Sequence, residues 1–335
     1  FWLKSFIVFG TKTTGLLAMP FLVYLALLLA CAAALQFEPP SGLTGEQVAS
    51  SVPDGLPEKR YLGPDNPGCR KLKRADWDET IVGGSVVNDS TKFPFIAWIG
   101  DKDGTGLRQF CGGSLISDRV VLTAAHCLYQ EDSKNAGIYV RLRLTDYAQE
   151  PGLAYRVVNW ARHEQVNLRS LRNDIGLLLL NESVPKDLVQ PVPLSNGTQG
   201  FERSGEKVIA GWGSTDERCL NHDAQLRETS VPMGSSGPSC STPGSKVLTE
   251  GEQFDPNTQL CAGAYSSQKM EYPGCGDSGG PLLHSGPDGF VQVGFVDWTY
   301  GFPYPDVFTR VSSYLEWIWA TSAQLEAQGK RRNVH

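Results

Sequence analysis

The stretch Gly276-Asp277-Ser278-Gly279-Gly280-Pro281 places a serine among glycines, directly after an aspartate. The glycines suit it to a tight turn. A serine hydroxyl becomes a good nucleophile only when a neighbouring base accepts its proton. The backbone N–H groups of Gly276 and Ser278 can point together at a developing oxyanion, because Gly276 has no side chain to disturb the loop. We therefore predict a nucleophilic serine here and expect its partners elsewhere in the chain.

A base and an orienting acid occur upstream. The run Leu122-Thr123-Ala124-Ala125-His126-Cys127 places a histidine after small residues, and Asp174 opens the apolar run Ile175–Leu180. Such a run is typical of a buried strand. A buried aspartate needs a hydrogen-bond partner, which an imidazole N–H supplies. The order His126, Asp174, Ser278 is that of chymotrypsin and differs from that of subtilisins and α/β-hydrolases.

With these motifs, the segment from Ile81 to about Ala323 resembles the trypsin/chymotrypsin family of serine proteases. The resemblance also rests on Ile81-Val82-Gly83-Gly84, Cys111-Gly112-Gly113-Ser114-Leu115-Ile116, Gly211-Trp212-Gly213 and Thr309-Arg310-Val311. It implies an all-β fold of two six-stranded Greek-key β-barrels. The active site would lie in the cleft between them, with His126 and Asp174 from the first barrel and Ser278 from the second. It also implies a short C-terminal helix around residues 314–319.

Short apolar runs separated by turn residues independently indicate an all-β chain. The expected strands cover Val120–Leu122, Ile138–Leu144, Ile175–Leu180, Val208–Ala210, Pro281–Leu283 and Val291–Val296. Residues 324–335 are expected to form a polar C-terminal tail.

The first part of the chain is predicted to lie outside this fold. Residues 1–34 contain an apolar run from Phe21 followed by Cys31-Ala32-Ala33-Ala34, which is typical of a signal peptide and its cleavage site. The first methionine is Met19. Residues 1–18 are therefore interpreted either as part of a longer product or as a spurious extension. Because residues 15–37 carry no charge, a retained membrane anchor is the alternative.

Residues 35–80 are rich in Pro, Gly, Ser and charged residues, so they cannot bury a core. By resemblance they form a propeptide. Its removal would free the α-amine of Ile81, which would pair with Asp277 and shape the oxyanion loop. The family is usually cut after Arg or Lys, whereas Thr80 precedes Ile81 here. We expect an activating protease of non-tryptic specificity, trimming in two steps, or a chain that never matures.

The eight cysteines favour an oxidising compartment. The resemblance implies the disulfides Cys111–Cys127 and Cys240–Cys261. The family's usual partner of Cys275 is missing, because residues 298–307 contain no cysteine. We therefore pair Cys275 with Cys219, whose loop runs beside it in this family's fold; two free thiols are the alternative. Three sequons predict glycosylated surface loops, at Asn88, Asn181 and Asn196.

Substrate choice departs from that of trypsin. The position of trypsin's pocket-floor aspartate holds Tyr272, or Pro273 if one residue is deleted nearby. Asp306 stands where the family usually has a glycine in the pocket wall. Its carboxylate could bind a substrate Lys or Arg. It could instead fill the pocket together with Tyr272 and favour small or apolar side chains.

Three more residues are predicted near the substrate: Asp297, Trp298 and Thr299. Asp297 replaces the family's serine close to the catalytic aspartate. Two carboxyl groups that near should raise the pKa of one of them. Thr299 replaces a glycine at the pocket entrance, so large side chains should enter poorly.

The formal charge of −6, without a basic block, argues against a nucleic-acid partner. No acidic cluster occupies the family's calcium-loop position between Arg143 and Val157, so neither a metal nor another cofactor is expected. The sequence thus predicts a secreted, monomeric serine endopeptidase, made as a zymogen and acting on proteins or peptides. The alternatives are a secreted non-catalytic homologue that only binds a partner, and a membrane-tethered protease.

Overall fold

The structure is a computed structural model. It describes residues 81, 84–103, 106–128, 137–168, 170–215, 223–234, 240, 254–263, 272–298 and 305–332, all within one compact unit, Pro57–His335. The expected leader and propeptide, residues 1–80, lie outside the described residues, as do Cys219 and Thr299.

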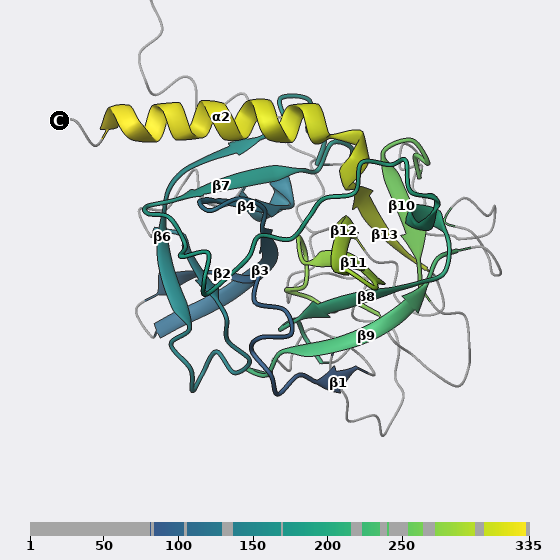
Figure 1. Cartoon of the computed structure of the whole chain (residues 1–335), viewed down its shortest axis with the longest axis horizontal. Coiled ribbons are helices and arrows are strands. Elements are labelled where there is room, and N and C mark those ends of the chain that lie inside the picture. Colours follow the sequence, from purple (N-terminus) through teal and green to yellow (C-terminus); the bar gives the residue numbers. More distant parts are fainter. Residues whose placement is uncertain are drawn as a thin grey trace, which may run out of the picture. The chain divides into compact units, whose positions relative to one another are not determined.

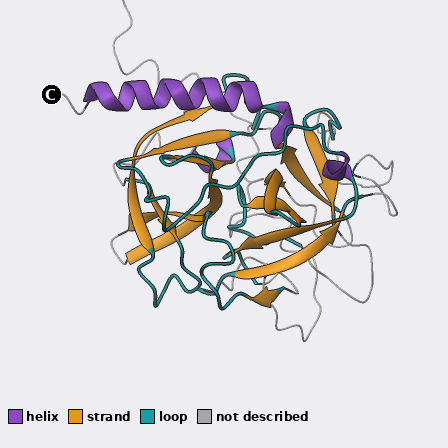
Figure 2. Ribbon diagram, in the orientation of Figure 1, coloured by secondary structure: helices purple, strands orange, loops and turns teal. Residues whose placement is uncertain are grey.

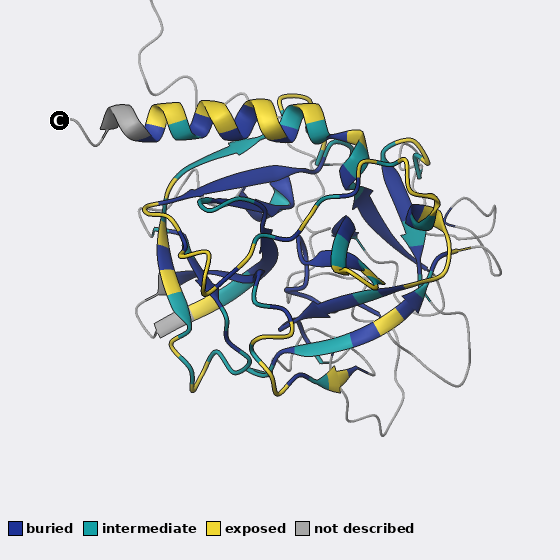
Figure 3. Cartoon of the chain, in the orientation of Figure 1, coloured by how far each residue is buried: buried dark blue, intermediate teal, exposed yellow. Residues whose placement is uncertain are grey.

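Six antiparallel strands close the first barrel in the order β2-β3-β4-β7-β6-β5 (Figure 1). β7 is buried along its whole length (Figure 3), which explains its continuous apolar sequence. Trp98, Ile99 and Leu122 are among the largest side chains of the core. The strands are β2 (Ile96–Asp103), β3 (Gly106–Leu115), β4 (Val120–Thr123), β5 (Tyr139–Leu142), β6 (Leu153–Arg162) and β7 (Gly176–Leu180).

The second sheet has the order β1-β9-β8-β11-β12-β13-β10. An antiparallel bridge between Met233 and Ala262 joins the end of β9 to β10, and the Gly234 amide donates to the Cys261 carbonyl at 3.0 Å. Six strands therefore curl round on themselves, with β1 as a seventh strand beside β9. The strands are β1 (Ser85–Val86), β8 (Glu206–Gly211), β9 (Arg227–Pro232), β10 (Gln259–Ala262), β11 (Pro281–Gly286), β12 (Gly289–Trp298) and β13 (Asp306–Arg310).

The predicted all-β, two-barrel class is confirmed, and each predicted strand overlaps an observed one. Among the described residues, helical structure is confined to short 3-10 turns and to α2 (Leu315–Arg332), as Figure 2 shows.

The C-terminal helix α2 packs on β7 and β6 through buried side chains that include Ile318 and Leu325 (Figure 1). It is longer than expected. Residues 324–332, predicted as part of a polar tail, continue the helix because most of them are strong helix formers. No helix within the described residues is both long enough and apolar enough to span a membrane.

The two barrels come very close at the segment that carries Ser278. The Gly112 amide of β3 donates to the Ser278 carbonyl at 2.8 Å. Gly279 follows with φ +80°, and a β-carbon on it would lie 2.6 Å from the Gly112 carbonyl oxygen and overlap the hydroxyl of Thr123. The glycines at this junction are therefore required for both backbone conformation and space.

Gly279→Ala should lower the free energy of unfolding of the uncleaved chain by about 2–4 kcal/mol, because it combines a left-handed backbone with an overlap. Urea denaturation measures this. Gly200→Ala is the matched control, since nothing lies within 4 Å of a β-carbon there. Equal stability of the two variants would contradict the close approach.

Candidate active site

The register between β4 and β7 brings His126 and Asp174 together. Thr123, the last residue of β4, pairs with Gly176, the first of β7. His126 lies just after Thr123, in a 3-10 turn over Ala125–Leu128, and Asp174 lies just before Gly176. Antiparallel pairing therefore places the segment leaving one strand beside the segment entering the other.

The Asp174 carboxylate holds His126 through two hydrogen bonds. The His126 backbone amide donates to Oδ1 at 2.7 Å, and the ring nitrogen Nδ1 lies 2.5 Å from Oδ2. Asp174 is wholly buried, while 9 % of the His126 side chain is exposed. Burial acts to raise the pKa of Asp174, but attraction to His126 and the hydrogen bonds around the carboxylate outweigh it and leave the pKa below its usual value. Asp174 thus remains an anion that orients the ring.

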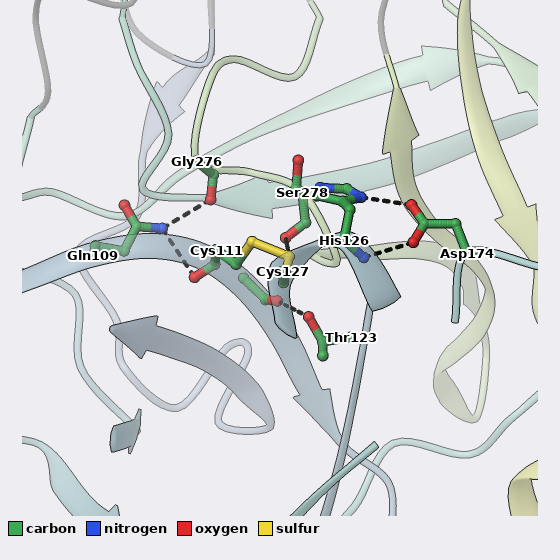
Figure 4. The surroundings of a disulfide bond; sticks show 9 residues. Gln109, Cys111, Thr123, His126, Cys127, Asp174, Gly276 and Ser278 are labelled. Carbon is green, nitrogen blue, oxygen red and sulfur yellow. Dashed lines mark hydrogen bonds and ion pairs between the residues drawn. A yellow bond between two sulfur atoms is a disulfide. The ribbon is translucent and has the colours of Figure 1, made fainter. Parts of the chain in front are cut away.

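Ser278 lies on the side of the imidazole away from Asp174 (Figure 4). It comes from the loop before β11, so nucleophile and base belong to different barrels, as predicted. The loop turns at Gly276, whose φ of +99° requires a glycine. Within the described residues the amides of Gly276 and Ser278 donate to no protein acceptor, which suits them to a developing oxyanion.

Asp277 is the buried acid of this same loop. Its carboxylate accepts hydrogen bonds from the Gly213 and Gly274 amides, both at 2.8 Å. Burial raises its pKa to about 6, even though these two hydrogen bonds oppose the rise. Ile81, its predicted partner in activation, is buried in the core of the second sheet. In the uncleaved chain the Ile81 nitrogen is part of a peptide bond and carries no charge.

Gln109 was missed by the sequence analysis. Its Nε2 donates to the Gly276 carbonyl at 2.9 Å and to the Cys111 carbonyl at 3.2 Å (Figure 4). The side chain therefore links β3 of the first barrel to the loop that carries the predicted oxyanion amides. No pattern in the sequence indicated this role, because the two residues are 167 positions apart.

The residues predicted to set substrate specificity differ in how far they are buried. Tyr272, Pro273 and Asp306 are buried, and Trp298 is half-buried at the end of β12. The Asp306 carboxylate lies beside Gly263, 3.6 Å from the position of a β-carbon there. Asp297, also predicted at the substrate, is buried, and one of its carboxyl oxygens lies within 4.8 Å of polar atoms of His126 and Asp174.

Two of the expected disulfides are present, Cys111–Cys127 and Cys240–Cys261. The first braces the segment that carries His126 (Figure 4). Cys275 is also disulfide-bonded, but its expected partner Cys219 lies outside the described residues. The three sequon asparagines, Asn88, Asn181 and Asn196, are all exposed.

Two groups of possible metal ligands occur within the described residues. Cys111, His126 and Cys127 form one, but the disulfide occupies both sulfurs. His126, Asp174 and Asp297 form the other, with the offered atoms within 4.8 Å of one another. There the His126 Nδ1 is already hydrogen-bonded to Asp174, so this cluster is better described as two members of the triad plus one further acid.

A serine beside an imidazole that is oriented by a buried carboxylate defines a serine hydrolase site. The family model for trypsin matches residues 81–318. The chain is 32% identical to human cathepsin G over 243 residues, which are 72% of this chain and 87% of that protein. It is 31% identical to bovine duodenase-1 over 251 residues, 74% of this chain and 92% of that protein. The chain belongs to the trypsin/chymotrypsin family of serine proteases.

Gln109→Ala should lower kcat about tenfold with little change in KM, because it leaves the Gly276 carbonyl without its donor and loosens the oxyanion loop. Steady-state kinetics on a peptide substrate, corrected by active-site titration, would measure this. Gln149→Ala, at an exposed position, is the control. A rise in KM alone would contradict a role in the oxyanion loop.

Proposed function

We propose that the mature protein, beginning at Ile81, is a secreted serine endopeptidase that hydrolyses peptide bonds through an acyl-enzyme. The proposal depends above all on the paired hydrogen bonds from His126 to the buried Asp174, with Ser278 beyond the ring. This arrangement supplies a nucleophile, a base and an orienting anion in one place.

The chemistry follows from these positions. His126 accepts the Ser278 proton while the serine oxygen attacks the scissile carbonyl carbon, and Asp174 stabilises the imidazolium that forms. The Gly276 and Ser278 amides stabilise the oxyanion of the tetrahedral intermediate. His126 then gives its proton to the leaving amine, which leaves an ester on Ser278. Water, deprotonated by His126, cleaves that ester and restores the serine.

Activation by cleavage before Ile81 is part of the proposal. The wholly buried Asp277 carboxylate, whose pKa of about 6 lies above its usual value, offers a favourable partner for a cation. A new α-amine at Ile81 would supply one and would favour the ionised carboxylate. Because Thr80 precedes the bond, we propose an activating protease of non-tryptic specificity.

Secretion and a monomeric state complete the proposal. Disulfides persist in oxidising compartments, and the exposed sequon asparagines are accessible for glycosylation. A non-catalytic binding protein is not favoured, because such a protein does not need a buried aspartate bonded twice to one histidine.

For substrate choice we propose a preference for Lys or Arg before the scissile bond, with Asp306 as the anchor. A buried carboxylate at the start of β13 is suited to a guanidinium or ammonium group.

Ser278→Ala should abolish labelling by a fluorophosphonate probe, because it removes the hydroxyl group that lies beside the His126 ring. Wild-type protein whose N-terminus is verified as Ile81 should be labelled. Ser285→Ala, at an exposed position on β11, should be labelled like wild type. Failure of correctly cleaved wild type to react would refute the enzyme proposal.

Asp306→Asn should lower kcat/KM for Lys and Arg substrates by roughly a hundredfold, about 3 kcal/mol, because the substrate cation loses its buried partner. Cleavage after Leu or Ala should change little. A peptide-library profile of wild type, Asp306→Asn and Asp306→Gly measures both effects. A wild-type preference for Ala, Val or Leu would show instead that Asp306 and Tyr272 fill the pocket.

A further inference from the structure

A second buried carboxyl group lies beside the catalytic aspartate. Asp297 lies on β12 with 1 % of its surface exposed, and one of its carboxyl oxygens lies within 4.8 Å of one from Asp174. The mechanism proposed above does not use this proximity. Two carboxylate anions this close in a buried site repel each other strongly, whereas a protonated carboxyl group can donate a hydrogen bond to a carboxylate. Protonation of one of the two groups is therefore favoured.

The hydrogen bonds around Asp297 indicate where that proton lies. Its Oδ2 accepts two hydrogen bonds, from Gln259 Nε2 and Thr309 Oγ1, both at 3.1 Å. Its Oδ1 receives no hydrogen bond from a described donor. An ionised Asp297 would therefore have a buried, unsatisfied oxygen beside another anion, whereas a protonated Asp297 can donate to Asp174.

Of the two carboxyl groups, that of Asp174 is the more favourable one to ionise. It accepts two hydrogen bonds from His126, which also becomes positively charged during the reaction. Burial, and then the neighbouring charge of Asp174, raise the pKa of Asp297 well above its usual value. The pair shares one proton, and both considerations assign it to Asp297.

Among the described residues, no Lys or Arg stabilises an ionised Asp297. The described groups that face Asp297 are Asp174, His126, the neutral Gln259 and Thr309, and Tyr314. Burial above all raises the pKa of Tyr314 to about 12, so the phenol is neutral at physiological pH. Beyond it, Asp255 is ion-paired with Arg172 at 2.9 Å. Within the described structure no Lys or Arg forms an ion pair with Asp297.

We propose that Asp297 is a positioning residue that carries a proton in the working enzyme and donates it to Asp174 as a hydrogen bond. The inference rests on the proposed function in so far as it concerns activity. Loss of the proton would set two anions against each other and remove a donor from Asp174. It would also place a second negative charge near His126 and favour the imidazolium, which cannot accept the Ser278 proton. Activity should therefore fall as the pH rises through the pKa of Asp297.

The first test compares pH profiles of kcat and KM on a peptide substrate for wild type, Asp297→Asn and Asp297→Ala. The amide of Asn can donate to Asp174 at every pH, so Asp297→Asn should keep wild-type kcat at neutral pH and lose the alkaline decline due to this group. Asp297→Ala should lower kcat roughly ten- to a hundredfold with little change in KM. Asp187→Asn, at an exposed position, should reproduce the wild-type profile.

If Asp297→Asn lost activity as Asp297→Ala does, or kept the alkaline decline unchanged, the proposal would be wrong. A second measurement does not need turnover or a folded variant. Infrared difference spectra of wild type, recorded while the pH is raised from neutrality, should show loss of a protonated carboxyl band. Absence of that band at neutral pH would overturn the inference. An inactive protein that shows the band would contradict the proposed enzyme function and leave the assignment of the proton intact.

Discussion

The hydrogen bonds between the buried Asp174 and His126 are the constraint on which the rest of the site depends. A wholly buried carboxylate is unfavourable unless donors surround it, and His126 supplies two from one residue. That requirement sets the position of the imidazole beside the start of β7. The two barrels lie close together at Gly112 and Ser278. This closeness places Ser278 beside the side of the imidazole ring that faces away from Asp174. Fold stability and catalytic geometry therefore have the same physical basis here.

Three wholly buried acids lie around this centre, and each is accommodated in a different way. Asp174 is stabilised by an imidazole and remains ionised. Asp277 is held by two backbone amides, and its pKa of about 6 leaves it ready for an incoming cation. Asp297 faces another carboxyl group and is best accommodated as a neutral acid. Identical side chains thus have different charges because their neighbours differ in the number of donors and in charge.

The triad could be predicted from sequence because each member lies in a short motif whose local chemistry is recognisable. Ser278 lies among glycines, His126 follows small residues, and Asp174 opens an apolar strand. The strands were predictable for a similar reason, since burial imposes apolar runs that turn residues interrupt. The full length of α2 was not predicted, because its polar residues suggested a tail and only its packing on β6 and β7 shows a helix that continues to Arg332.

The sequence by itself determined the family, the order of the catalytic residues and the replacement of the family's usual serine by Asp297. These follow from residue identity and spacing along the chain. Only the tertiary structure decided that Gln109 holds the Gly276 carbonyl and that Gln259 donates to the Asp297 carboxyl group. Both contacts join segments far apart in the sequence, and their distances depend on barrel closure and strand register. A single sequence carries no local pattern for such pairs, whereas the folded chain places them within hydrogen-bonding distance.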